Sequence, residues 1–272
     1  MTLPPVDEAQ RSASETQWLE QDLAWAIKAE QQVLYYQPIV DLASGRIAAF
    51  EALVRWRHPQ RGLLGPDELI PACEATGWIL PLGRWILLQA CRQIVPWRQL
   101  PEQAALRVNI NISGQQLVAP GFIDELVAVT QQAGTPPSAI ALEVKESLLV
   151  DAPESMALLW QVRRRGFSIQ IDGFGTGYTS LRELSRSPID TLKIDRSFVA
   201  RMKPGRQDAE VVRAAAALGT SFGMDVVAEG VETTSQLAQV RQLGASQAQG
   251  YLFSRALPAA EAAALLAANR RW

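Results

Sequence analysis

Short apolar segments alternate with amphipathic helical segments along most of the chain. The apolar segments lie at residues 34–40, 47–56, 106–113, 140–147, 167–172, 190–195, 225–230 and 247–253. Strands that alternate with helices predict a parallel sheet, and eight such repeats in 272 residues predict a (β/α)8 barrel of the TIM type.

Helical patterns follow the second strand and each later one. They lie at residues 66–100 (two helices), 120–133, 153–166, 179–186, 206–222, 233–243 and 258–268. The first two strands are joined only by the hairpin-length link at 41–45, which predicts that they are antiparallel. The fold class is therefore α/β, a TIM-type barrel whose first strand runs antiparallel to the rest.

The N-terminus differs from the rest of the chain. Residues 1–14 are polar and contain two prolines, so they are interpreted as a tail or linker before one domain at 15–272. A helix is expected next, with one apolar face made of Trp18, Leu19, Leu23, Ala26 and Ile27.

Composition excludes several classes of protein. The 26 basic and 28 acidic side chains give a net charge of -2, whereas a binder of nucleic-acid polymers would carry a basic excess. One histidine and two cysteines leave little material for a zinc site or a Ser-His-Asp triad. We see no apolar run long enough for a membrane span and no signal peptide, so we expect a cytoplasmic protein.

Polar side chains stand near the ends of most of the predicted strands. They are Glu51 and Arg55, Asn109 and Asn111, Glu143 and Lys145, Asp172, Lys193 and Asp195, Glu229, and Gln249. The C-terminal ends of barrel strands meet at one end, where active sites are built. Glu51, Asn111, Glu143 and Asp172 would then bring together oxygen ligands of the kind that Mg²⁺ or Mn²⁺ prefers. The alternative is that each acid caps a helix or pairs with a surface lysine.

The stretch from Asp172 to Leu181, "DGFGTGYTSL", places an acid where a strand opens into a glycine-rich loop. The spacing is not that of a dinucleotide-binding loop, because position 178 is a tyrosine. The glycines are interpreted as permitting a tight turn.

Taken together, these segments resemble the EAL domain family. The motifs are "YYQPIV", "FEALVRWRHP", "VNINIS", "LEVKES", "DGFGTGYTSL", "LKIDRSFV", "VVAEGVE" and "QGYLFSR", and they cover residues 17–270. The resemblance implies a barrel with one antiparallel strand that hydrolyses the bacterial messenger cyclic di-GMP to a linear dinucleotide with two Mg²⁺ or Mn²⁺ ions. It also implies a homodimer.

The resemblance also assigns roles to single residues. It implies metal ligands at Glu51, Asn111, Glu143, Asp172 and Glu229, with Glu51, Lys193 and Glu229 forming the catalytic set. Lys193 would hold the attacking water. Gln37, Leu53, Arg55 and Gln249 would contact the substrate or lie near it, and Glu146 would steady the glycine-rich loop.

Two positions depart from the family pattern. Gly173 stands where the family has a second aspartate that binds the second metal, and Lys145 stands where it usually has threonine. Two hypotheses stay open: a metal-dependent phosphodiesterase, weakened at the second metal site, or an inactive receptor for cyclic di-GMP. A further hypothesis is that the Lys145 ammonium, with a charge of about +1, electrostatically replaces the missing acid and its metal. The alternative is that Lys145 extends into water or pairs with Glu146.

Overall fold

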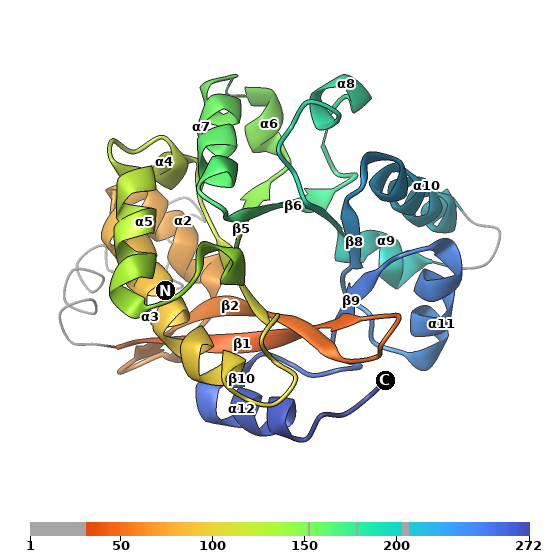
Figure 1. Ribbon diagram of the computed structural model, residues 1–272, viewed down its shortest axis with the longest axis horizontal. Helices are drawn as coiled ribbons and strands as arrows, with labels where there is room; N and C mark the ends of the chain where they lie inside the picture. The colour runs from red at the N-terminus through yellow and green to blue at the C-terminus, as the bar shows by residue number, and fades with distance from the viewer. Residues whose placement is uncertain (1–30, 152, 178, 203–206) are drawn as a thin grey trace, which may run out of the picture.

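The computed structural model describes residues 31–151, 153–177, 179–202 and 207–272. The predicted tail at 1–14 and the expected helix that follows it lie outside the described residues. Within them, helices surround a central closed sheet (Figure 1).

Eight strands close the barrel. They are β1 (Gln32–Asp41), β2 (Ile47–His58), β4 (Arg107–Asn111), β5 (Ile140–Lys145), β6 (Ser168–Phe174), β7 (Thr191–Ile194), β8 (Asp225–Ala228) and β9 (Gln247–Gln249). Their order around the barrel is β1-β9-β8-β7-β6-β5-β4-β2, and β2 closes it by pairing with β1. β1 is antiparallel to both β2 and β9, whereas the other neighbours in the ring are parallel, as the sequence predicts.

The helices lie outside this ring (Figure 1). They are α2 (Pro66–Thr76), α3 (Ile79–Arg98), α4 (Gly114–Leu117), α5 (Phe122–Ala133), α6 (Ser147–Asp151), α7 (Pro153–Arg164), α8 (Leu181–Leu184), α9 (Arg196–Arg201), α10 (Gln207–Phe222), α11 (Thr234–Leu243) and α12 (Ala259–Ala267), with a 3₁₀ turn at Pro137–Ala139. None of the described helices combines the length and the apolarity that a bilayer crossing requires.

Several elements differ from the prediction. Two short strands, β3 (Gly62–Leu64) and β10 (Leu257–Pro258), extend the sheet beside β2 and β1, and the short helices α4, α6 and α9 follow strand ends. β9 ends at Gln249 rather than continuing to residue 253. The backbone turns at Gly250, where an added Cβ would lie 2.1 Å from the Val231 carbonyl oxygen. Only glycine fits such a close approach of two backbone segments.

Strand alternation explains where the core lies. On β2, Phe50, Ala52, Val54 and Trp56 are buried and pack with residues of the surrounding helices, including Trp97 of α3. The alternate residues of β2, including Glu51, lie on the opposite face of the strand. The apolar shell therefore lies between sheet and helices, and the barrel interior receives the polar side chains together with a small apolar cluster of Ile39, Ala49 and Val227.

Candidate active site

Lys193 lies at the centre of a buried charged cluster. Every residue of its strand, β7, is buried, and its own side chain is 1% exposed. Its ammonium nitrogen lies 2.6 Å from Glu143 Oε2, 2.7 Å from Glu229 Oε1 and 3.2 Å from Glu51 Oε2. These acids come from β5, from the residue after β8, and from β2. One cation thus joins three carboxylates supplied by separate parts of the barrel.

Amide side chains complete the surroundings of Glu51. Asn111 Nδ2 donates to Glu51 Oε1 over 2.7 Å, and Gln249 Nε2 donates to Glu51 Oε2 over 2.7 Å. Gln249 Nε2 also donates to Gln37 Oε1 over 3.2 Å, and Gln37 Nε2 donates to the Ser254 carbonyl over 3.2 Å. This network connects β1, β2, β4 and β9 and fixes the orientation of the Glu51 carboxylate.

Glu143 accepts a hydrogen bond from one amide inside the barrel, and that amide also donates to a second one. The fully buried Asn109 donates through Nδ2 to Glu143 Oε1 at 2.8 Å and to Gln170 Oε1 at 3.0 Å. Asn109 is among the predicted strand-end polar residues, whereas Gln170 is not. The available signal was alternation, because Gln170 precedes Asp172 by two residues and therefore shares its face of β6.

Asp172 and Gly173 lie in a bulge of β6. The pairing with β7 runs from Ile171↔Leu192 to Phe174↔Ile194, so β6 carries one residue more than its partner. Gly173 adopts φ +73°, a left-handed conformation that glycine takes without steric cost. An added Cβ at Gly173 would approach only Thr176 Oγ1, at 3.6 Å, so the position has room for a side chain. Bulges of this kind often lie beside active sites, where they redirect a side chain.

Glu146 lies under the glycine-rich loop. Its side chain is buried, and Oε2 accepts hydrogen bonds from the backbone N–H groups of Gly175 at 3.1 Å and Gly177 at 3.0 Å. Oε1 accepts from the N–H of Thr179 at 3.1 Å. A Cβ at Gly177 would lie 2.9 Å from the Glu146 carboxyl carbon, which explains the glycine there. These three hydrogen bonds connect the glycine-rich loop to Glu146.

The crowding of charges shifts several pKa values. Burial, with repulsion from Glu51, raises the pKa of Glu143 to about 8 despite the attraction of Lys193. Burial also raises the pKa of Glu229 to about 7, with Asp172 and Glu51 adding repulsion against the attraction of Lys193. Burial acts to raise the pKa of Glu51 as well, but Lys193 and hydrogen bonds from two amides outweigh it and lower that pKa. The carboxylates, led by Glu143, overcome burial and raise the pKa of Lys193 well above its ordinary value.

Other predicted site residues stand apart from this cluster. Arg55 is half-buried, donates to the Val54 carbonyl at 2.9 Å, and lies over the Tyr35 ring at 5.7 Å. The partly buried Leu53 occurs two residues earlier on β2. Lys145 is the exposed last residue of β5. Asp195 accepts from the N–H of Ser197 at 2.8 Å and caps α9, so for this acid the helix-capping alternative holds.

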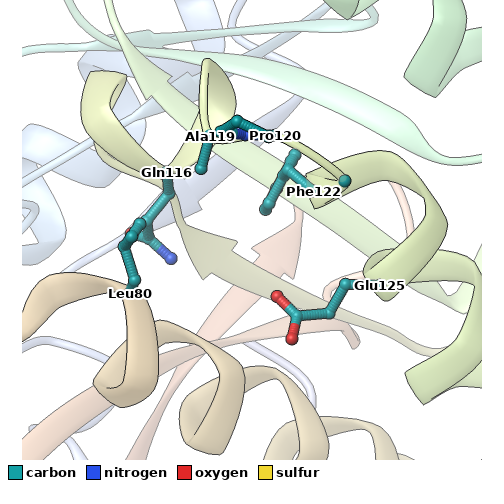
Figure 2. A pocket seen from close by; sticks show the side chains of 7 residues that line it. Leu80, Gln116, Ala119, Pro120, Phe122 and Glu125 are labelled. Atoms are coloured by element: carbon teal, nitrogen blue, oxygen red, sulfur yellow. The ribbon is translucent and has the colours of Figure 1, made fainter.

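A separate hollow of about 240 Å³ lies among residues of α3, α4 and α5 and the turn before α5 (Figure 2). Its lining residues are Leu80, Gln116, Ala119, Pro120, Gly121, Phe122 and Glu125. The Glu125 carboxylate lies 3.3 Å from Arg84. Among its lining residues the hollow therefore has one acid, which is paired, and it lacks the clustered charged groups of the barrel interior.

Comparison with known proteins decides the family. The family model described as "EAL domain" matches residues 20–256. The chain belongs to the EAL domain family. Its barrel with one antiparallel strand and its polar interior are thus those of an EAL domain.

The EAL domain is similar to proteins of Pseudomonas aeruginosa. It is 42% identical over 261 residues to the cyclic di-GMP phosphodiesterase NbdA, covering 96% of this chain and 33% of NbdA. It is 39% identical over 257 residues to the bifunctional diguanylate cyclase/cyclic di-GMP phosphodiesterase MucR, covering 94% of this chain and 37% of MucR. The chain therefore spans about a third of the length of these relatives.

A solved structure extends the likeness to three dimensions. The PaMucR phosphodiesterase in complex with c-di-GMP is 39% identical, with a TM-score of 0.86, and the match covers 90% of this chain and 99% of that chain. The two proteins are therefore similar in sequence as well as in fold.

The donor set of the EAL domain fits a divalent cation. Glu51, Glu143, Glu229 and the nearby Asp172 supply four carboxylates against the single ammonium of Lys193. The Oε1 atom of Gln249 is also buried without a hydrogen-bond partner in the described structure. Such an excess of hard oxygen donors is what Mg²⁺ and Mn²⁺ prefer. Across the described ranges, however, no three His, Cys, Asp or Glu side chains form a ready metal-binding group, and Lys193 lies between three of the acids.

Proposed function

We propose that this EAL domain binds cyclic di-GMP and hydrolyses it to the linear dinucleotide in a reaction that depends on Mg²⁺ or Mn²⁺. The observation that carries the proposal is the excess of carboxylates around Lys193 where barrel strands end. Similarity to proteins named as cyclic di-GMP phosphodiesterases supports this substrate. The likeness to a structure with c-di-GMP bound supports it further.

Glu51, Asn111, Glu143, Asp172 and Glu229 would hold the cations. A bound divalent cation lowers the pKa of a coordinated water and stabilises the charge that develops on the phosphate. Loading the site requires the carboxylates to exchange part of their contact with Lys193 for contact with the cation. Asn111 already orients Glu51 through a 2.7 Å hydrogen bond, so that carboxylate is fixed before any ligand arrives.

The chain's own side chains would then position the substrate and the water. Lys193, held by carboxylates on three sides, would keep its proton and orient the attacking water through its ammonium group. Arg55 would offer its guanidinium to a phosphate, a group that guanidinium binds in a fixed geometry. Gln37, Leu53 and Gln249 would contact the substrate or lie near it, as the family resemblance implies.

A second function has its own support, in Gly173. The bulge after Asp172 places a residue without a carboxylate where the family resemblance implies a second-metal ligand. A two-metal mechanism needs both ions to stabilise the attacking and leaving oxygens. A site that binds the ligand without cutting it would make the domain a receptor for cyclic di-GMP.

One experiment separates these functions. The native chain is incubated with cyclic di-GMP and Mn²⁺, binding is followed by calorimetry, and the products are resolved by chromatography. We expect binding, a linear dinucleotide as product, and loss of turnover in Glu51→Gln but not in the remote Glu125→Gln. Binding without turnover would favour the receptor, and absence of binding would contradict both functions.

Three features implied earlier stay predictions: the homodimer, the cytoplasmic location and the extent of the domain over 15–272. Sedimentation of the native chain tests the first. A protein of one chain mass at micromolar concentration, with and without ligand, would contradict the homodimer.

A further inference from the structure

Lys145 and Asp172 are neighbours where β5 and β6 end. The parallel register pairs Lys145 with Asp172, one residue before Gly173. Alternation along β5 directs Lys145 to the same side of the strand as Glu143, two residues earlier. Lys145 therefore lies at the mouth of the barrel, by which we mean the end where β5, β6 and β7 reach their C-termini.

The ammonium group of Lys193 already contacts three acidic side chains. It contacts the side chains of Glu51, Glu143 and Glu229, and the acidic side chain of Asp172 lies close by. A cyclic dinucleotide brings two further negative charges, one on each phosphodiester. Without more positive charge at the mouth, the carboxylates would repel the ligand phosphates.

Arg55 and Lys145 are the candidates to supply that charge. Each lies near the mouth, and neither forms an ion pair within the described residues. Among the described residues Lys145 forms no ion pair with Glu146, whose carboxylate accepts three backbone hydrogen bonds from the glycine-rich loop. The ammonium of Lys145 is thus exposed and available to a ligand.

We propose that Lys145 is a phosphate-binding residue of this site, whose ammonium pairs with one phosphate of the cyclic dinucleotide beside Asp172. The inference rests on the proposed function, since it takes the same ligand. The proposed contact depends on Lys145, which stands where the family usually has threonine. In this view Lys145 contributes to affinity and not to the activation of water, which an ammonium cannot perform as a metal does.

Gly173 belongs to the same arrangement. Because Gly173 has no side chain, the end of β6 beside Lys145 carries one carboxyl group, that of Asp172, instead of two. The open space beside the Gly173 Cβ position, limited only by Thr176 Oγ1 at 3.6 Å, would admit an aspartate. An added aspartate would compete for Lys145 in the absence of metal and would favour a cation in its presence.

The test compares cyclic di-GMP binding by calorimetry in EDTA for the native chain, Lys145→Gln, Lys145→Arg and Arg92→Gln. Arg92 is an exposed residue of α3, so its replacement removes the same charge away from the mouth. We expect Lys145→Gln to weaken binding about tenfold, or roughly 1.4 kcal/mol. Lys145→Arg should retain most of the affinity and Arg92→Gln all of it. The loss should shrink at high salt, because screening weakens an exposed ion pair.

A metal-dependent pair of variants gives an independent readout. Lys145→Thr should bind weakly in both EDTA and Mn²⁺, whereas Lys145→Thr with Gly173→Asp should recover affinity only in Mn²⁺. If Lys145→Gln binds as tightly as the native chain at low and high salt, the phosphate contact is refuted while the proposed function stands. If the native chain itself does not bind cyclic di-GMP, the proposed function fails and this inference fails with it.

Discussion

The Lys193 ammonium donates a 2.6 Å hydrogen bond to Glu143 inside the barrel, where the two side chains are 1% and 0% exposed. A buried ion pair of this kind gains little net stability over an apolar pair, because both charges lose their hydration. Removing one partner is different, since the remaining charge stays buried and unpaired. Replacing Lys193 should therefore lower the free energy of unfolding of the whole domain.

We therefore expect Lys193→Met to destabilise the metal-free protein by about 3–5 kcal/mol, the usual cost of breaking a buried pair. Urea denaturation measures the change. Lys145→Met removes an exposed ammonium and should stay within about 0.5 kcal/mol of the native chain. Equal stability of the two variants would show that the three carboxylates do not depend on Lys193.

Gly173→Asp should create a stronger second metal site. Crystals of the native chain soaked in Mn²⁺ should show one strong anomalous peak near Asp172, and the variant should show two. Turnover of cyclic di-GMP should rise in the variant whether the native chain is an active or an inactive domain, because two-metal hydrolysis needs both ions. Aspartate is among the residues that tolerate positive φ, so the fold should accept it.

Gly173→Ala is the matched control for that variant. It adds the same backbone restriction at φ +73° without a carboxylate, so it should leave the number of Mn²⁺ peaks unchanged. Two equally occupied peaks in the native chain would contradict the idea of a weakened second site.

Mn²⁺ affinity should increase with pH. The pKa of Glu143 is raised to about 8 and that of Glu229 to about 7, so both are largely protonated at pH 6 in the metal-free protein. A cation must displace those protons, and affinity should rise by up to about tenfold per pH unit for each proton released. Calorimetry at pH 6 and pH 8 in buffers of differing ionisation enthalpy measures both the affinity and the proton release. An affinity that is the same at both pH values would contradict these ligands.

The same shifts predict how pH changes the stability of the metal-free chain. The raised pKa values mean that the folded state holds more protons than the unfolded state between about pH 4.5 and pH 8. The free energy of unfolding should therefore fall as the pH rises through this window. The lowered pKa of Glu51 affects stability only near and below pH 4.5, its ordinary pKa. The raised pKa of Lys193 affects stability only above pH 10.5, its ordinary pKa. Denaturation at pH 6 and pH 8, with and without Mn²⁺, tests this; a rise in stability toward pH 8 without metal would contradict it.

Gly177→Ala should loosen the glycine-rich loop. The new Cβ would lie 2.9 Å from the Glu146 carboxyl carbon, so the carboxylate must move away from the amides that it holds. Hydrogen exchange at the N–H groups of Gly175 and Thr179 should become faster. Gly65→Ala adds a Cβ with no neighbour within 4 Å and should leave this exchange unchanged. Unchanged exchange in Gly177→Ala would show that the loop does not depend on Glu146.

The sequence by itself determined the barrel and the chemical types at the strand ends. Apolar runs separated by helical patterns give the strand–helix repeat and the parallel direction of the strands. The short link at 41–45 allows only an antiparallel first pair. Glu51, Glu143 and Lys193 could be named from the strand ends because alternation and strand direction act locally along the chain.

Only the tertiary structure decided which of these groups meet. The pairing of Lys193 with three carboxylates joins residues up to 142 positions apart, and no local pattern encodes such a contact. The role of Gln170 depends on the register of β6 against β5, and the position of Gly173 depends on a bulge against β7. The Asp195 carboxylate, similar in sequence context, instead caps a helix. Local periodicity sets the face of each strand, but register, bulges and closure set the distances between side chains, and those distances determine which charges are paired and which are left free for a ligand.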